Sequence, residues 1–453
     1  MPKTNDPQSL IDYRPISILP ILSKVFERLI LQQLTDHIER KAIYLEYQSG
    51  FRKSHSTITL LLKLKDDIKA AMSRSEVTIA VFADFSKAFD TVDYRIFLRH
   101  LSNLGFSNQT LLLIGDYLTN RKQFVQVDDR MSESLDIQFG VPQGSILGPI
   151  LFNLYITSIN TNGPSMYLLY ADDTTLLRHS KIKNLATTIK SIQAEMNNIN
   201  LWSKRNNLSL NAKKTKMTFF STSQLSQRHD LSSVITDFQS GDQKIEKVNN
   251  FKVLGIRFNE HLDWTEHINS IARCCYATLR TLKLFKNIAS YYQRKTLSEA
   301  LILSKINYGN ILLSDAPKYQ LNRLQKFQNA AAGFVLKRHA VIKDVIKLNW
   351  LPIVESIDLS LAKAAHNAIH NVNWPSYIKL TRLHSNRTSR SSETSAYDID
   401  DRTRLNGSFK HESAKCFNDL PLDIKKIESK QSFGVKCRNY FIDKATARLL
   451  NMS

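Results

Sequence analysis

Two adjacent acidic residues, Asp172 and Asp173, stand between two short apolar runs of this 453-residue chain. The runs, residues 166–170 and 174–177, have the length and the flanking residues of hairpin strands, so we expect the acids at the tip of a β-hairpin. Two carboxylates about 4 Å apart repel by about 4 kcal/mol at an effective dielectric constant near 20, and a bound cation would relieve that repulsion. Acidic residues at a hairpin tip are also ordinary turn chemistry. The pair alone therefore leaves a turn and a metal site as alternatives.

A third acid, Asp84, closes an alternating run formed by Val77, Ile79 and Val81. The alternation predicts a strand that ends at this acid. If that strand and the hairpin are neighbours in one sheet, three carboxylates converge, as two-metal phosphoryl or nucleotidyl transfer requires. Magnesium suits such a site, because proteins hold it with one or two carboxylates plus substrate phosphates.

The composition bounds the partners and the compartment. Hydrophobic residues make up 42% and charged residues 23%, which is typical of a folded, soluble protein. The net charge of +21 favours a polyanionic partner, with solvated lysines as the alternative. No apolar run reaches the roughly 18 residues of a membrane span, and no signal-peptide core is present, so we expect a protein of the nucleus, the cytoplasm or both, not a secreted one. The four cysteines show no metal-binding spacing, so carboxylates must hold any metal.

Helical and strand patterns alternate without a regular βαβ series, which predicts an α+β fold. Within residues 12–40, Ile21, Val25, Leu29 and Leu34 are near helical spacing and indicate a buried helix. Further helices are expected at residues 60–72, at residues 185–202 and through most of residues 264–370. Further strands are expected at residues 208–220 and 251–256, and a hairpin from residues 124–127 and 137–141. The polar stretch 385–401 is expected to be a mobile connection.

Seven short strings occur in the order of reverse transcriptase motifs. They are residues 14–20, 48–52, 84–90, 140–149, 170–173, 211–215 and 253–255. The chain resembles the polymerase of non-LTR, LINE-type retrotransposons, particularly the jockey-like group, closely over about residues 10–340. The resemblance implies an RNA-directed DNA polymerase with a right-hand fold. Fingers and palm, with an antiparallel sheet, would occupy residues 1–242, the primer grip and helical thumb residues 243–340, and a mainly helical C-terminal region of unknown role residues 341–453.

The resemblance also assigns the catalytic residues. Asp84 and Asp172 would be the main ligands of two Mg²⁺ ions, with Mn²⁺ as an alternative, and Asp173 would be the supporting acid. Lys214 would protonate the departing pyrophosphate. Its neighbours Lys213 and Lys216 leave the register of that assignment open.

Further positions would contact the substrates. Phe89 would be the steric gate that excludes a 2′-hydroxyl; a core aromatic is the alternative. Phe85, Gln143 and Gly144 would contact the nucleotide or the template, although residues 142–144 also read as a plain turn. Arg14, Lys24 and Arg52 are candidates for binding the triphosphate or the template backbone, or are surface cations. Val253, Leu254 and Gly255 would grip the primer, and Arg273, Arg280, Lys283 and Lys286 would lie on the thumb or on the charged face of a packed helix.

The implied partners are an RNA template, a DNA primer or target and deoxynucleoside triphosphates, without a membrane; the oligomeric state stays open. Nothing resembles the endonuclease-like domain, the N-terminal extension or a ribonuclease H, so the resemblance implies a truncated element or partial gene. An inactive relic that only binds nucleic acid is therefore the alternative function. A group II intron maturase, or another reverse transcriptase lineage, would share the same active site. The absence of a maturase-like tail counts against this third possibility. Near the C-terminus, Trp350 and Phe417 are expected to be core anchors rather than base-stacking platforms.

Overall fold

The computed structural model divides into two compact units. It describes residues 6, 8–9, 13, 15–127, 129–159, 163–231, 234, 237–382, 398–399 and 405–450. The first unit comprises residues 1–52, 79–218 and 232–248, and the second comprises residues 53–78, 219–231 and 249–453. The stretch 385–401, apart from residues 398–399, lies outside the described residues.

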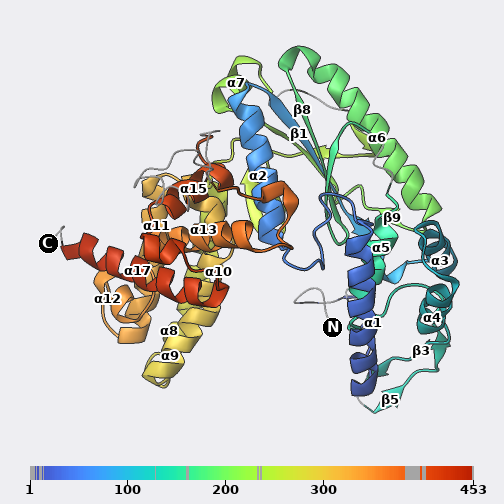
Figure 1. Ribbon diagram of the computed structural model, residues 1–453, viewed down its shortest axis with the longest axis horizontal. Coiled ribbons are helices and arrows are strands. Elements are labelled where there is room, and N and C mark those ends of the chain that lie inside the picture. The colour runs from blue at the N-terminus through green and yellow to red at the C-terminus, as the bar shows by residue number, and fades with distance from the viewer. Residues whose placement is uncertain are drawn as a thin grey trace. The chain divides into compact units, whose positions relative to one another are not determined.

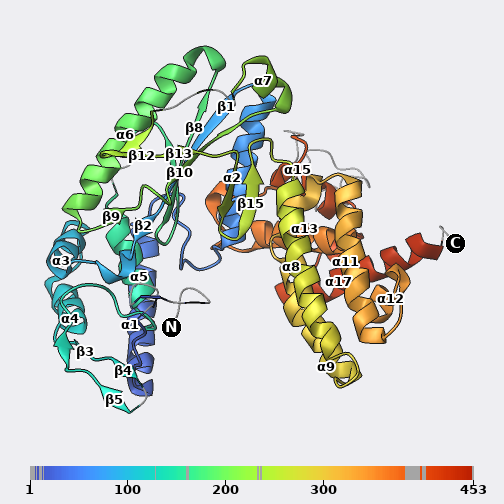
Figure 2. The ribbon, with the colours of Figure 1, turned by 180° about the vertical axis from the view of Figure 1, so that it is seen from behind.

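A five-stranded sheet forms the centre of the first unit, with the strand order β13-β10-β1-β8-β7 (Figures 1 and 2). All seven residues of β1 are buried, as expected for a strand that is covered on both faces. The β7 and β8 strands are antiparallel, whereas β10 and β13 are parallel. The sheet is therefore mixed and not wholly antiparallel as predicted. Its strands are β1 (Val77–Ala83), β7 (Met166–Tyr170), β8 (Asp173–Ser180), β10 (Lys216–Phe220) and β13 (Glu246–Lys247).

The helix predicted over residues 185–202 is present as α6 (Leu185–Arg205). Its buried face includes Ile192, Met196 and Ile199, and the helix packs against β8. Spacing by three and four residues therefore identified the helix and its buried face correctly. The other helices and strands of this unit are α3 (Tyr94–Asn103), α4 (Asn108–Leu118), α5 (Gly148–Ile156), β2 (Phe85–Ser86), β9 (Ser209–Leu210), β11 (Gln239–Ser240) and β12 (Gln243–Lys244).

The hairpin predicted from residues 124–127 and 137–141 is only partly correct. Two short antiparallel pairs form it, β3 (Lys122–Gln123) with β6 (Leu135–Asp136) and β4 (Gln126–Val127) with β5 (Arg130–Met131). Residues 137–141 leave the hairpin after Ile137 and follow a different segment. There the Gly140 and Val141 amides donate to the carbonyls of Val92 and Phe89 at 2.9 and 2.8 Å. This pairing ties the 140–149 motif to the 84–90 motif.

The prediction of a buried helix within residues 12–40 is wrong for the first half of α1 (Ile21–Arg40). Ile21, Val25 and Leu29 are 81%, 55% and 58% exposed, and of the four spaced residues only Leu34 is buried. The buried residue of this half is Glu27, whose Oε2 accepts hydrogen bonds from the Ile146 and Leu147 amides at 2.6 and 3.1 Å. The hydrogen bonds of the Glu27 carboxylate to free amides beside the start of α5 therefore determine which face of this half of α1 is buried. The apolar stripe does not determine it.

The second unit is mostly helical, as predicted. The first helix, α2 (Thr57–Ser73), begins with a capping box between Ser56 and Thr59. A hairpin, β14 (Asn250–Val253) with β15 (Ile256–Asn259), precedes the remaining helices. These are α8 (Thr265–Leu284), α9 (Tyr291–Ser298), α10 (Ser304–Asn307), α11 (Lys318–Leu336), α12 (Ile342–Lys347), α13 (Ile353–His370), α15 (Phe409–Asn418), α16 (Leu422–Lys425) and α17 (Lys430–Leu450); a short α7 (Ser223–Arg228) also belongs to this unit.

The C-terminal region packs onto the helices that precede it. The α13 helix contacts α11, α15, α17 and the 3₁₀ turn at residues 310–315. Residues 341–453 therefore share one compact unit with residues 249–340, where the sequence suggested two regions. Trp350 is 5% exposed and Phe417 is fully buried, so both are core anchors as predicted. Among the described residues, no helix combines the length and the apolar character needed to span a bilayer.

Candidate active site

The tip of the β7–β8 hairpin carries the acidic pair. Tyr170 pairs with Asp173, which leaves Ala171 and Asp172 as a two-residue loop. Ala171 has a φ of 55°, in the left-handed region that short hairpin loops use. The sequence therefore places the two carboxylates at a tight turn, as expected.

The 48–52 motif fixes this hairpin from its other edge. The Ser49 amide donates to the Leu169 carbonyl at 2.8 Å, and the Leu169 amide donates to the Tyr47 carbonyl at 3.1 Å. A Cβ on Gly50 would lie 2.5 Å from the Ala171 nitrogen, which is too close for any side chain. Glycine is thus required here so that the two backbones can touch.

Asp84 directly follows β1, and β1 is the neighbour of β8 in the sheet, so Asp84 lies at the end of the strand next to the hairpin. Burial, which is the largest cause, and the charges of Asp172 and Asp84 together raise the pKa of Asp173 to about 6, against the opposing charge of Lys214. The structure thus brings the three predicted acids into one electrostatic neighbourhood. Their mutual repulsion is the situation that a bound cation relieves.

Lys214 reaches the same place through the segment that follows β9. The β9 strand pairs with β2, directly after Asp84, and the Asn211 amide donates to the Asp84 carbonyl at 2.8 Å. The Lys214 Nζ atom lies 3.5 Å from Asp84 Oδ2. Lys216 instead pairs with Glu246 at 2.7 Å, on the strand beside it. Of these two lysines, the structure therefore brings Lys214 to the acids.

The residues of this site fit a divalent cation. Asp84 Oδ2 is buried and accepts no hydrogen bond from the described part of the chain, although the Lys214 ammonium is near it. No three His, Cys, Asp or Glu side chains among the described residues are arranged to hold an ion by themselves. Magnesium needs only one or two carboxylates when phosphate and water complete its shell.

Phe89 belongs to a cluster of aromatic rings. It is half-buried and stacks on Phe152 with 4.1 Å between ring centroids and 19° between planes, and it meets Phe51 edge-on at 6.4 Å. A half-buried, stacked ring fits both a gate and a core aromatic, so the gate assignment stays a prediction. Phe85 does not suit a nucleotide contact: it is 2% exposed and packs on Trp202, so the sequence-based assignment is corrected to a core residue.

The loop at residues 142–144 is held at two points. Gln143 Nε2 donates to Asp90 Oδ1 at 2.6 Å, and the Gln143 carbonyl accepts from the Ser17 amide at 2.7 Å. Gly144 is exposed, has a φ of 104° and leaves no room for a Cβ, which would lie 2.9 Å from the Ser17 carbonyl oxygen. The half-buried Gln143 and the exposed Gly144 remain open to a substrate.

Two of the three predicted basic contacts, Lys24 and Arg52, lie among the described residues. The Arg52 guanidinium donates to Glu39 at 2.8 and 3.1 Å and to the Gln48 carbonyl at 2.9 Å, so a phosphate would have to displace these partners. Lys24 is exposed on α1. Arg14 lies outside the described residues.

The predicted primer grip is the turn of the β14–β15 hairpin in the second unit. Leu254 and Gly255 have φ values of 45° and 89°, as a two-residue hairpin loop with both φ values positive requires. The Tyr308 hydroxyl donates to the Leu254 carbonyl at 2.7 Å and braces the turn. Arg273, Arg280 and Lys283 are exposed on α8, opposite a buried face that includes Ile268, Ile271 and Leu279. The thumb assignment therefore stays open beside that of an ordinary charged helix face.

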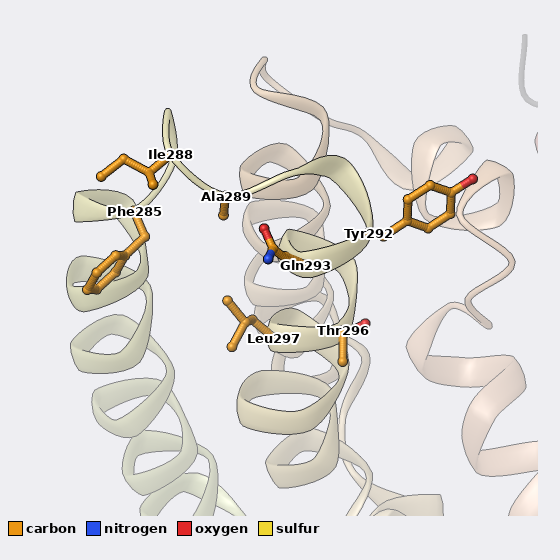
Figure 3. Close-up of a pocket in the computed structure, with 7 residues that line it drawn as sticks. All are labelled: Phe285, Ile288, Ala289, Tyr292, Gln293, Thr296 and Leu297. Carbon is orange, nitrogen blue, oxygen red and sulfur yellow. The ribbon is translucent and has the colours of Figure 1, made fainter.

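A separate cavity of about 640 Å³ opens where α8 ends and α9 begins (Figure 3). It contains none of the predicted site residues, so we do not assign it to the polymerase site. Its lining is Phe285, Ile288, Ala289, Tyr292, Gln293, Thr296 and Leu297.

Sequence reasoning missed Glu27 and Asp90. Glu27 is an isolated acid in an apolar stretch, and its burial follows from the tertiary contact with residues 146–147. Asp90 was inside the 84–90 motif, but no spacing rule connects it with Gln143, 53 residues further on.

Comparison with known proteins decides the family. The family model "Reverse transcriptase (RNA-dependent DNA polymerase)" matches residues 1–258, more than half of the chain. The chain belongs to the reverse transcriptase family. This membership confirms the resemblance from which the polymerase motifs were assigned.

Two relatives in Drosophila melanogaster place this reverse transcriptase among those of non-LTR transposons. "Probable RNA-directed DNA polymerase from transposon BS" is 30% identical over 330 residues, which cover 70% of this chain and 35% of the relative. "RNA-directed DNA polymerase from mobile element jockey" is 26% identical over 429 residues, which cover 92% of this chain and 44% of the relative. The chain thus matches less than half the length of either relative.

Proposed function

We propose that this chain is an RNA-directed DNA polymerase that extends the 3′-hydroxyl of a DNA primer on an RNA template with deoxynucleoside triphosphates. One observation carries the proposal: Asp84, the Asp172–Asp173 hairpin and Lys214 meet in one site of a reverse transcriptase chain. Nucleotidyl transfer uses groups of this kind: carboxylates that hold metal ions, and a basic side chain beside them.

In this proposal Asp84 and Asp172 hold two divalent cations, Mg²⁺ or Mn²⁺, and Asp173 supports them. When bound, the cations supply positive charge that activates the primer hydroxyl and stabilises the leaving oxygens. The hydroxyl would give up its proton to solvent water, and its oxygen would bond to the α-phosphorus of the nucleotide while the bond to pyrophosphate breaks. Lys214, which is 67% exposed beside Asp84, donates a proton to the departing pyrophosphate.

The other predicted residues bind and select the substrates. Phe89 excludes the 2′-hydroxyl of a ribonucleotide, Gln143 and Gly144 contact the nucleotide or template, and Leu254 with its neighbours grips the primer. The net charge of +21 supports binding of RNA and DNA.

Primer extension tests the proposal. Oligo(dT) annealed to poly(rA) is incubated with dTTP and Mg²⁺, and the wild type is compared with Asp84→Ala and Asp172→Ala. Asp36→Asn is the matched control, because Asp36 is an exposed acid on α1. We expect extension by the wild type and the control and none by the other two variants. Extension that survives both substitutions would overturn the site assignment.

The net charge also favours a second candidate, an inactive relic that only binds nucleic acid through its basic surface. Binding that weakens steeply with salt fits both candidates. Only magnesium-dependent incorporation of nucleotide separates them, and a wild type that binds the template but incorporates nothing would favour the relic.

A further inference from the structure

The Asp90 side chain bonds to a predicted nucleotide contact, Gln143, but has no role in the proposal so far. Asp90 ends the single turn of 3₁₀ helix at residues 88–90, directly after Phe89. Its Oδ1 atom accepts a hydrogen bond from Gln143 Nε2 at 2.6 Å, and both side chains are half-buried. A short bond to a carboxylate is among the stronger hydrogen bonds in proteins.

The bond determines which way the Gln143 amide faces. A carboxylate has no proton to donate, so only the NH₂ group of Gln143 can point at Asp90. The Gln143 Oε1 atom therefore points the other way, and one N–H remains for a second partner. Without Asp90 the amide could rotate and present either group.

The backbone around Asp90 is fixed independently of that bond. The amides of Gly140 and Val141 bond to the carbonyls of Val92 and Phe89, and Tyr94 donates to the Gly140 carbonyl at 2.9 Å. A Cβ on Gly140 would lie 2.8 Å from the Asp90 carbonyl oxygen. Loss of the Asp90 carboxylate would therefore free the Gln143 side chain while the two segments stay together.

We propose that Asp90 is a positioning residue for the incoming nucleotide: it holds the Gln143 amide in one orientation, so that Oε1 and one N–H meet the substrate. The inference rests on the proposed function, in which Gln143 contacts the nucleotide or template. Asp90 acts on nucleotide binding through Gln143 and takes no part in the chemical step.

A double-mutant cycle tests this inference. Single-nucleotide incorporation of dTTP on poly(rA)·oligo(dT) is measured for the wild type, Asp90→Ala, Gln143→Ala and the double variant, with thermal unfolding of each. We expect Asp90→Ala to raise the KM for dTTP about tenfold, as loss of a positioning contact does, with kcat changed less than about threefold. Adding Asp90→Ala to Gln143→Ala should raise KM by less than about twofold, because the residue it positions is already gone.

A conservative variant separates positioning from mere packing. The Asp90→Asn variant keeps an oxygen that can accept from Gln143 but adds an NH₂ group that can donate to it, so it should reverse only part of the rise in KM caused by Asp90→Ala. Asp90→Leu keeps a similar volume without an acceptor and should behave like Asp90→Ala. If Asp90→Asn and Asp90→Leu have the same KM for dTTP, the inference is wrong.

Other outcomes also overturn it. A wild-type KM in Gln143→Ala or in Asp90→Ala contradicts the inference, as do effects of the two substitutions that simply multiply. Any of these outcomes refutes only the role of Asp90, provided that the wild type incorporates dTTP and Asp84→Ala does not. A wild type that incorporates nothing overturns the proposed function and this inference with it.

Discussion

Lys214 Nζ lies 3.5 Å from Asp84 Oδ2, although more than a hundred residues separate the two in the sequence. Two contacts of the backbone hold them together: Asn211 donates to the Asp84 carbonyl at 2.8 Å, and the Asp84 amide donates to Thr215 Oγ1 at 3.4 Å. The segment at residues 211–215 is therefore part of the acidic site and not a separate basic loop.

We predict that Lys214→Ala slows the chemical step of incorporation about a hundredfold, the usual scale of a lost general acid. Lys216→Ala is the matched control, because Lys216 pairs with Glu246 and not with the acids. Single-turnover kinetics at saturating dTTP measures the step directly. Equal rates for the two variants would show that Lys214 has no special role.

We predict that Gly50→Ala reduces extension at least about tenfold and destabilises the chain by roughly 1–3 kcal/mol, because its Cβ would force the Ala171 backbone away. Gly115→Ala is the control: it lies within α4, and its Cβ would meet Leu98 at an ordinary 3.5 Å. That change should stabilise by about 0.5–1 kcal/mol and leave extension intact. Urea unfolding and primer extension measure both effects. A normally active Gly50→Ala would show that the clamp on the hairpin is dispensable.

Phe89→Ala is expected to increase incorporation of UTP relative to dTTP by about tenfold or more, since removing the ring opens space for a 2′-hydroxyl. It should also lower stability, because the ring stacks on Phe152. Phe152→Leu is the control, since it disturbs the same stack from a fully buried position. Unchanged selectivity in Phe89→Ala would make Phe89 a core aromatic only. Competition between labelled UTP and dTTP supplies the measurement.

The stability of the second unit should depend on pH through Asp66. Burial raises the pKa of Asp66 to about 7, even though its carboxylate accepts a hydrogen bond from the Phe409 amide at 2.8 Å. Because the folded-state pKa lies above the unfolded value of about 3.9, the folded chain binds the proton more tightly. The stabilisation is fully present below about pH 4 and is lost as the pH rises through 7.

The free energy of unfolding of the wild type should therefore fall between pH 5 and pH 8, whereas that of Asp66→Asn should not fall for this reason. The difference between the two proteins should shift by roughly 2–3 kcal/mol in favour of Asp66→Asn over this range. Asparagine keeps an oxygen for the Phe409 amide, so the comparison isolates the charge. Urea unfolding at both pH values, followed by tryptophan fluorescence, measures the difference. A difference between the two proteins that is the same at pH 5 and pH 8 would contradict the raised pKa.

Local sequence patterns predicted much of the fold and the order of the site motifs. Alternation ending at Asp84 and two apolar runs around Asp172 located the acids at strand ends, because strand periodicity is a local property. The spacing of α6 predicted its buried face for the same reason. The resemblance to reverse transcriptases supplied the roles that periodicity cannot give.

Long-range contacts decided what the sequence left open or predicted wrongly. The choice of Lys214 over Lys216 depends on which strand lies beside β10, and the bond between Asp90 and Gln143 depends on how two loops meet. The orientation of α1 likewise depends on Glu27 and its bonds to residues 146–147. Such contacts leave no regular spacing in the chain.

The central claim is that Asp84, Asp172 and Asp173 form a site for nucleotidyl transfer. Magnesium-dependent incorporation of dTTP on poly(rA)·oligo(dT), measured in a single turnover, tests it most directly. We predict incorporation by the wild type that EDTA abolishes, and a loss of about a hundredfold or more in Asp84→Asn and Asp172→Asn, which remain folded. Incorporation at the wild-type rate by either variant, or none by the folded wild type, would contradict the account.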